Sequence, residues 1–213
     1  MIIPVASLEQ HGPALATGVD IICATGVAHR VARRMVEAGE QVVVTPCVWT
    51  GLAEHHVPFG GTVTLDYAAF GGVLRGIVRS AARAGFKRAM LLNGHGGNAP
   101  VGALALQMMT ENPALSIKFH NWYNQPWTWE TAMAIDRSGS HGNWMENFPW
   151  TRLANAPSPS GSKPGVDTAL MKASPPAKVR DMLGDGSFGG EWRKPDEDML
   201  RLWQAGVAET RAA

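Results

Sequence analysis

The chain has 213 residues, a length typical of one domain. Its 19 basic and 18 acidic residues leave a formal net charge of +1, which argues against nucleic-acid or membrane-surface binding through bulk charge. No apolar run approaches the roughly 18 residues of a membrane span and no secretory leader is evident, so we expect a cytoplasmic location and no membrane partner.

The first part of the chain alternates predicted strands and helices. Apolar runs predict strands at residues 1–7, 41–48, 86–92 and 115–119. Helical spacing of apolar residues predicts helices at 20–38 and 66–85, with Asp20 and Asp66 as candidate N-cap residues. A third helix is predicted after the turn at 93–98 and runs to about residue 111. Because the strands are apolar throughout, we expect an α/β fold with a mostly parallel sheet and helices on both faces.

The pattern weakens after residue 120. Residues 155–166 and 184–190 indicate loops, and residues 195–210 predict a final amphipathic helix. We expect a single domain over residues 1–213, with a core of 1–150 and a C-terminal extension of 151–213. Tryptophans gather in the weakly patterned part, where they could form a flat pocket for a cyclic substrate or simply pack: Trp122, Trp127, Trp129 and Trp144.

Side chains suited to metal binding follow the predicted strand ends. Glu9, His11 and Asp20 come after the first strand, and His95 comes after the third. In open α/β sheets, ligands bind at the carboxyl ends of the strands. Carboxylates and imidazoles without a thiolate suit Zn, Mn or Fe, and Asp20 could bridge two such ions.

Two other segments could contribute to this site. The glycine-rich turn at residues 93–98 fits neither dinucleotide nor P-loop phosphate motifs, so we interpret it as a close approach of backbone to a metal or substrate. His141 and Glu146 are five residues apart. If Gly142 begins a helix, Glu146 lies one turn after its start and could bind a metal. His141 then lies at the N-terminus of that helix and could act as an acid or base.

These segments together resemble the creatininase family of metal-dependent amidohydrolases. The family signature Gly-Ser-x-Glu-Gln-His-Gly-Pro, followed by Gly-x-Asp, is matched from residue 7 to 13 and at 18–20. The central Asn-Gly-His-Gly-Gly-Asn is matched in full at 93–98, and the loop with a His ahead of Phe-x-Gly-Thr at 56–62. The third motif, His-Ala-Gly-x-x-Glu-Thr-Ser, is matched loosely at 141–148. The resemblance covers roughly residues 1–150.

The resemblance implies a layered α/β/α sandwich with two divalent metal ions, Zn foremost and Mn or Fe as alternatives. Glu9, Asp20 and His95 would hold one ion. His11, Asp20 and Glu146 would hold the other, so that Asp20 bridges them. His141 would pass a proton to the leaving nitrogen. Further candidates, for contact with the substrate, are His56, Trp144, Gly96 and Gly97.

This sequence departs from the family pattern at several positions. Creatinine-hydrolysing members have a Glu at the position of Gly97, and the residue before the third-motif His is usually acidic but is Ser140 here. We therefore expect hydrolysis of a C–N bond in a small cyclic amide or formamide, without singling out creatinine. The alternatives are a hydrolase of a ring ketone or lactone and a catalytically impaired metal-binding relative. A homo-oligomer is also implied.

Overall fold

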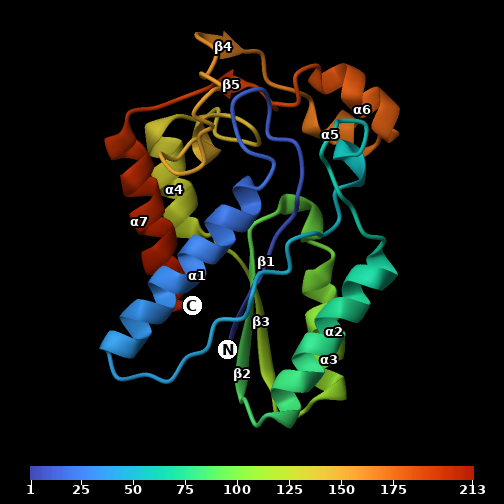
Figure 1. Ribbon diagram of the computed structural model, residues 1–213, viewed down its shortest axis with the longest axis vertical. Helices are drawn as coiled ribbons and strands as arrows, with labels where there is room; N and C mark the ends of the chain where they lie inside the picture. The colour runs from blue at the N-terminus through green and yellow to red at the C-terminus, as the bar shows by residue number, and fades with distance from the viewer.

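The computed structural model describes residues 1–213 and has three layers (Figure 1). Three parallel strands form the central sheet in the order β1 (Ile2–Val5), β2 (Arg88–Asn93) and β3 (Ser116–Asn121). One face is covered by α1 (Val19–Glu37), α4 (Pro126–Ile135) and α7 (Asp196–Ala212). The other is covered by α2 (Tyr67–Arg83) and α3 (Val101–Glu111). The predicted α/β fold with a mostly parallel sheet is confirmed.

Each face of the sheet has its own apolar core. Val27 of α1 and Leu202 of α7 belong to one cluster, while Leu74 of α2 and Leu104 of α3 belong to the other. Because both faces are covered, all four residues of β1 are buried, which explains its unbroken apolar sequence.

The register of the sheet brings three segments to one edge. Val5 pairs with Asn93, and Asn93 pairs with Asn121, so the carboxyl ends of the three strands are level. The residues that follow these strand ends therefore begin side by side, although they are far apart in the sequence.

The strand predicted at 41–48 is wrong as a continuous element. Only Val44 and Val48 form isolated parallel bridges, both with β1. The segment still runs along the sheet edge, since the Ala6 N–H donates to the Val48 carbonyl at 2.9 Å. Pro46 lies between the two bridges, and its lack of an N–H prevents a regular ladder there.

The two predicted N-cap residues have different outcomes. Asp66 caps α2 as expected, because its Oδ1 accepts from the Ala69 N–H at 2.8 Å. Asp20 does not cap α1: Gly18 is the N-cap residue, and Asp20 lies buried in the first turn. Its carboxylate is thereby available for contacts outside the helix.

The chain after β3 has more regular structure than its sequence predicts. Besides α4, the elements that were not predicted are β4 (Ser162–Lys163), α5 (Thr168–Lys172), α6 (Pro176–Leu183) and β5 (Gly190–Glu191). Three single turns are η1 (Glu54–His56), η2 (Gly96–Asn98) and η3 (Trp144–Glu146). The condition considered for Gly142 is not met: this residue has a φ of 67° and begins no helix, and only the short η3 follows. None of the helices has the length and apolar composition needed to span a membrane.

The C-terminal part packs closely on the rest. The predicted final helix is confirmed as α7, and its Met199, Leu202 and Val207 join the same apolar cluster as α1. Residues 151–213 thus share a core with residues 1–150.

A buried carboxylate from α7 replaces the missing cap of α4. The N-cap residue Gln125 forms no side-chain hydrogen bond. Instead, Glu209 accepts from the Trp127 N–H at 2.9 Å and from the Thr128 N–H at 2.8 Å and its Oγ1 at 2.7 Å. Burial alone would raise the pKa of Glu209, but these hydrogen bonds to the ionised form lower it.

We predict that Glu209→Ala lowers the free energy of unfolding by about 1.5–3 kcal/mol at neutral pH, because buried donors lose a charged partner. Since the pKa is lower in the folded chain, this stabilisation is complete above the unfolded-state pKa and is lost as the pH falls through the folded-state pKa. Urea unfolding at several pH values measures it. Gln204→Ala, on an exposed position of α7, is the control. An equal effect of both substitutions would contradict the capping role.

Candidate metal centre

The metal-binding side chains predicted from the sequence converge at the carboxyl edge of the sheet. Glu9 and His11 come from the β1–α1 connection, Asp20 from α1, His95 from the turn after β2, and Glu146 from η3. A cavity of about 990 Å³ opens over them. Glu9, Asp20, His95 and Glu146 line the cavity, and His11 is buried beneath it.

The first group consists of Glu9, Asp20 and His95. His95 Nε2 donates to the Leu52 carbonyl at 2.9 Å, so its Nδ1 presents a lone pair to the group. That nitrogen lies 3.1 Å from Glu9 Oε1 and 3.2 Å from Asp20 Oδ2. Three acceptor atoms therefore meet with no protein hydrogen between them, and only a proton or a metal cation can satisfy them.

The second group consists of His11, Asp20 and Glu146. His11 Nδ1 donates to the Glu9 carbonyl at 3.0 Å, which turns Nε2 toward the carboxylates. His11 Nε2 lies 3.1 Å from Asp20 Oδ1 and 3.7 Å from Glu146 Oε2. The two oxygens of Asp20 thus face different histidines, which is the arrangement of a carboxylate shared between two cations.

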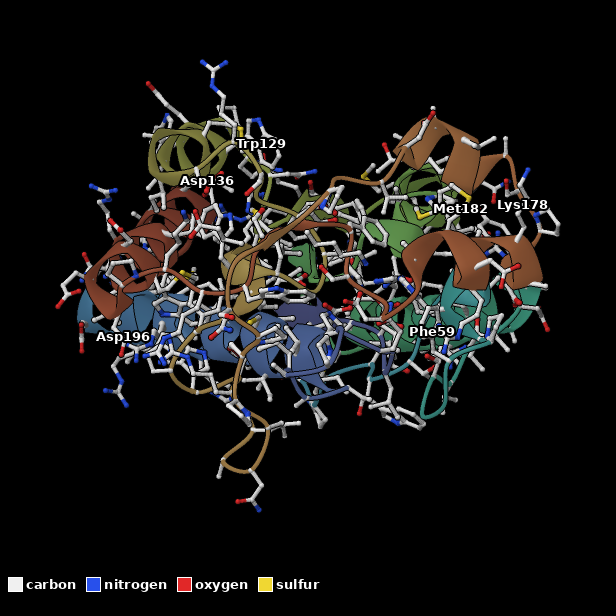
Figure 2. The ribbon with its side chains drawn as sticks, turned by 90° about the horizontal axis from the view of Figure 1, so that it is seen from above. Phe59, Trp129, Asp136, Lys178, Met182 and Asp196 are labelled. Atoms are coloured by element: carbon white, nitrogen blue, oxygen red, sulfur yellow. The ribbon has the colours of Figure 1, made fainter.

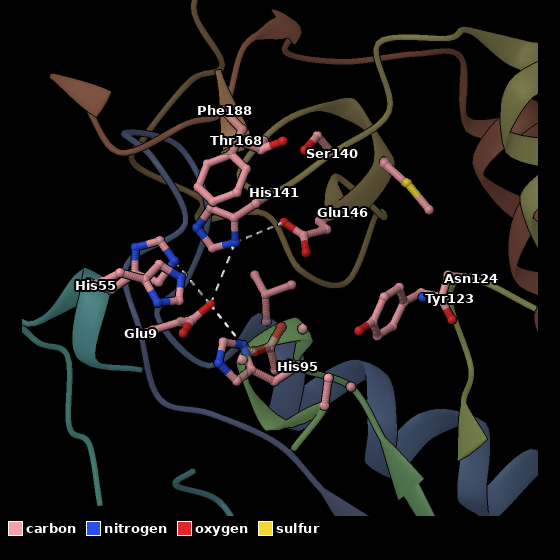
Figure 3. A pocket seen from close by; sticks show the side chains of 18 of the residues that line it. Glu9, His55, His95, Tyr123, Asn124, Ser140, His141, Glu146, Thr168 and Phe188 are labelled. Atoms are coloured by element: carbon pink, nitrogen blue, oxygen red, sulfur yellow. Dashed lines mark ion pairs between the residues drawn. The ribbon is translucent and has the colours of Figure 1, made fainter. Parts of the chain in front are cut away.

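His141 lies beside both groups (Figure 3). Its Nε2 is 2.9 Å from the Gln10 carbonyl, and its Nδ1 is 3.5 Å from Glu9 Oε1 and 4.0 Å from Glu146 Oε2. Because a carbonyl can only accept, the hydrogen is on Nε2 and Nδ1 faces the carboxylates as an acceptor. The ring can therefore hold a cation or take a proton at Nδ1.

The charges of the cluster shift the pKa values of its members in opposite directions. Burial alone would lower the pKa of His11, but Glu146 and Asp20 raise it to about 10. Burial would raise the pKa of Asp20, but His11 and His95 lower it to about 2. Burial lowers the pKa of His141 well below its usual value, and the neighbouring imidazoles add to this. The carboxylate pockets thus attract positive charge, while His141 is held neutral.

The donor set fits a pair of divalent cations. Glu9 Oε2 is buried without a hydrogen-bond partner, and Asp20 Oδ2 has only His95 Nδ1 at 3.2 Å, which is costly for carboxylates unless a positive charge is bound. The glycine-rich turn gives the cluster its space: a side chain at Gly97 would collide with the Leu52 carbonyl and the His95 ring. A carboxylate at position 97 is therefore excluded with this backbone, and Glu146 supplies the carboxylate next to His11.

Most of the predicted substrate contacts line the cavity. His56, Gly96 and Gly97 do so. Trp144 does not: its indole is fully buried in the core cluster shared by α1 and α7, so the predicted substrate contact by Trp144 is wrong. Trp129 takes its place as the more exposed aromatic side chain at the cavity.

The aromatic cavity residues Tyr123 and Phe188 were among those missed at the sequence level. Tyr123 lies just beyond the end of β3 at Asn121, and the rule that ligands bind at strand ends would have found it. Phe188 comes from the predicted loop 184–190 and packs on His141 with ring centroids 4.8 Å apart. No local sequence signal places Phe188 there.

Comparisons with known proteins point to one family. A family profile described as creatininase, creatinine amidohydrolase, matches residues 1–209. The chain is 34% identical over 127 residues to a 3-dehydro-scyllo-inosose hydrolase of Thermotoga maritima, covering 58% of this chain and 39% of that protein. It is 38% identical over 98 residues to the creatinine amidohydrolase of Pseudomonas putida, covering 45% of this chain and 36% of that protein. A mycofactocin precursor peptide peptidase of Mycobacterium tuberculosis is 38% identical over 109 residues, covering 49% of this chain and 42% of that protein.

Solved structures have the same fold. A crystal structure of creatinine amidohydrolase superposes with a TM-score of 0.75 at 21% identity, covering 99% of this chain and 87% of that chain. A Zn-Zn form of a creatininase mutant has the same TM-score, 0.75, the same 21% identity and the same coverage, 99% and 87%. The matched segments span less than half the length of the three curated relatives, at 39, 36 and 42%.

We predict that Asp20→Ala removes nearly all bound transition metal, because its carboxylate serves both groups, while His141→Ala leaves the metal content nearly unchanged. Elemental analysis after loading with Zn²⁺ measures both. Asp66→Ala, at the cap of α2, is the matched control. Equal metal content in the Asp20 and His141 variants would contradict the bridging role, and less than one equivalent in the unmodified chain would contradict a two-ion site.

We also predict that metal binding releases protons. The pKa of His11 is raised to about 10 and that of His95 is raised well above its usual value, so both rings are protonated at neutral pH and must lose the proton to bind a cation. Zn²⁺ affinity should therefore fall as the pH falls, with roughly one proton released per ion. Calorimetric titration in buffers of different ionisation enthalpy measures the release. His29→Ala, on an exposed position of α1, should change nothing. Identical heats in all buffers would argue against proton displacement.

Proposed function

The chain belongs to the creatininase family, and we propose that it is a metal-dependent hydrolase that cleaves a C–N bond in a small cyclic amide or formamide. The observation that carries the proposal is the sharing of Asp20 between two histidine–carboxylate groups, with a neutral imidazole beside them. The family profile supports hydrolase chemistry. Because the matched relatives differ in activity, the substrate class is our own inference.

The proposed ligand assignment follows the two groups. Glu9, Asp20 and His95 hold one ion, and His11, Asp20 and Glu146 hold the other. Zn²⁺ is our first choice and Mn²⁺ or Fe²⁺ the alternatives, since imidazole and carboxylate suit all three. When bound, the pair of ions supplies Lewis-acid chemistry, which polarises a carbonyl and lowers the pKa of water.

His141 is the proposed acid and base. Its Nδ1 faces Glu9 and Glu146 at 3.5 and 4.0 Å, and its low pKa keeps this nitrogen free of a proton at neutral pH. It can therefore accept a proton from the attacking water and return it to the leaving nitrogen. Ser140, in place of an acidic neighbour, leaves Nδ1 without a direct relay from that position. The backbone carbonyl of Gln10 orients the ring instead.

The cavity leaves room for more than a minimal substrate. It opens between α4, which carries Trp129, and the α5–α6 segment, and these lie on opposite sides when seen from above (Figure 2). We propose that the scissile group lies over the ligand cluster and that the aromatic face of Trp129 contacts a planar part of the substrate. A small-molecule substrate and a homo-oligomeric assembly remain parts of this proposal.

A ring ketone is the second candidate substrate. The match to the Thermotoga maritima 3-dehydro-scyllo-inosose hydrolase extends over 127 residues, more than the 98 residues matched in the Pseudomonas putida creatinine amidohydrolase. The backbone at Gly97 also favours this candidate over creatinine, because it leaves no room for the Glu that the creatinine-hydrolysing members have at this position.

The test is a screen of small lactams, formamides and cyclic ketones against the Zn²⁺- and Mn²⁺-loaded protein. We expect turnover of at least one amide or formamide, complete loss of activity with chelator, and a loss of roughly 10²–10⁴-fold in kcat for His141→Ala at unchanged metal content. His29→Ala is the control for an imidazole outside the site.

Three results decide between the alternatives. Turnover of ketones alone would replace the amide proposal by the second candidate. Metal binding without turnover of any compound would favour the impaired relative. Full activity of His141→Ala would remove the proposed role of that ring while leaving the hydrolase proposal intact.

A further inference from the structure

The side chain of Gln10 lies buried between the metal cluster and the C-terminal segment. Its Oε1 accepts from the Gly12 N–H at 2.9 Å, and its Nε2 donates to the Gly186 carbonyl at 2.9 Å. Both partners are backbone groups, one only a donor and the other only an acceptor. The orientation of the amide is therefore determined, since a rotation by 180° would break both hydrogen bonds.

This orientation determines the tautomer of His56. Its Nδ1 lies 2.8 Å from Gln10 Nε2, whose hydrogens can only be donated. Nδ1 must accept, so the proton of the neutral ring is on Nε2. His56 Nε2 is 3.6 Å from Glu9 Oε1 and thus directs an N–H toward that carboxylate. The ring is almost completely buried, at 1% exposure, which favours the neutral form.

The backbone of the same residue determines the tautomer of His141 and leaves the opposite kind of nitrogen facing the cluster. The Gln10 carbonyl is 2.9 Å from His141 Nε2 and can only accept, so Nε2 carries the hydrogen and Nδ1 is bare. Gln10 Nε2 also approaches His141 Nε2 to 3.1 Å, but both atoms are donors and this contact adds no hydrogen bond. The rings of His56 and His141 are stacked, with centroids 4.5 Å apart and an interplanar angle of 20°.

We propose that Gln10 is a positioning residue that sets the Nε2–H tautomer in both of these stacked histidines while opposite ring nitrogens face Glu9, Nε2 in His56 and Nδ1 in His141. His56 then presents an N–H to the cavity and His141 presents a lone pair. The ligand atoms of Glu9, His56 and His141 lie within 4.8 Å of one another, close enough to hold a metal ion. The proposal excludes His56 from that role, because its facing nitrogen carries a hydrogen. This last point rests on the proposed metal centre, whereas the tautomers rest on the hydrogen bonds alone.

The N–H of His56 has two uses in this arrangement. It directs a donor at Glu9 Oε1, the oxygen that also faces His95 and His141. It can also donate to an oxygen of a substrate bound over the cluster, which complements the acceptor offered by His141. A stacked pair with one donor and one acceptor can bind a substrate that has both a carbonyl oxygen and an N–H, as an amide has.

The C-terminal segment takes part in this arrangement. Gly186 has a φ of 102°, and a Cβ at this position would collide with the Gln10 amide. The close approach that anchors the amide therefore requires glycine. The same loop carries Phe188, which packs on both rings with centroids 5.9 Å from His56 and 4.8 Å from His141.

The test is the ¹⁵N spectrum of the imidazoles in the full chain at neutral pH, recorded by long-range ¹H–¹⁵N correlation. In the unmodified protein we expect His56 to show an unprotonated Nδ1 and a protonated Nε2. His141 should also show an unprotonated Nδ1 and a protonated Nε2, although in that ring it is Nδ1 that faces the carboxylates. A protonated Nδ1 in His56 would overturn the proposal.

The variant Gln10→Glu tests whether Gln10 is the cause. Its carboxylate can only accept, so His56 should become protonated at Nδ1, and the Nδ1 resonance should move to the protonated range. Gln107→Glu, the same change on exposed α3 where Gln107 accepts from Arg75 at 2.7 Å, should leave both rings unchanged. Gln10→Met, which keeps the volume and removes the donor, should give a mixture of His56 tautomers even if Gln10→Glu does not fold. An unchanged His56 spectrum in a folded Gln10 variant would show that another group sets its tautomer.

Titration of the unmodified protein with Zn²⁺ separates this proposal from the proposed function. We expect metal-induced ¹⁵N shifts at His11 Nε2 and His95 Nδ1 and none at His56 Nε2. A metal-induced shift at His56 Nε2 would overturn its exclusion from the ligand set. If no ring responds to Zn²⁺, the metal-centre proposal fails, while the tautomers measured without metal still decide the role of Gln10.

Discussion

The carboxylate of Asp20 divides its two oxygens between His11 and His95, and the candidate site is organised around this division. Each oxygen belongs to a group of a histidine and a second carboxylate. Such a concentration of buried negative charge is unfavourable by itself, because the protein interior solvates charge poorly. Protonated histidines can balance it, and so can metal cations. The raised pKa values of His11 and His95 are the signature of this demand for positive charge.

The histidines meet this demand because backbone carbonyls hold their outward nitrogens. His11, His95 and His141 each donate one N–H to a carbonyl, from Glu9, Leu52 and Gln10 respectively. In each ring the other nitrogen is left to face the carboxylates. His56 is the exception: the Gln10 amide donates to its Nδ1, so the nitrogen that faces Glu9 carries the hydrogen. A hydrogen bond to a backbone carbonyl holds an imidazole in a fixed orientation, which suits a side chain that must keep its other nitrogen directed at a metal ion.

The parts of the site at residues 7–20 and 93–98 were predictable because they depend on local sequence and on the rule that ligands bind at the carboxyl ends of parallel strands. Glu9 and His11 lie in the segment after β1 and His95 in the turn after β2, and the carboxyl ends of parallel strands lie at one edge of the sheet. Asp20 was singled out correctly as part of the cluster, although its expected capping role was wrong. A carboxylate at the start of a helix can either cap it or face elsewhere, and the local pattern does not distinguish the two.

The third motif was predicted less well because its geometry depends on distant contacts. Glu146 reaches the cluster from a single turn, and its carboxylate accepts from the Gly142 N–H at 2.6 Å. Trp144, beside it, turns into the core formed with α1 and α7. That choice requires α7 to be in place, and α7 follows some 50 residues later. A local pattern contains no information about this packing.

The sequence by itself determined the fold class, the residue types of the site and the family resemblance, because strand periodicity and short motifs are local properties. The tertiary structure decided which oxygen of Asp20 faces which histidine and why a carboxylate cannot stand at Gly97. It also decided how the 184–190 loop closes over the site. Gly186 meets Gln10 from 176 positions away. Such contacts depend on the packing of the whole chain, so they and the histidine tautomers that they impose become visible only in the folded protein.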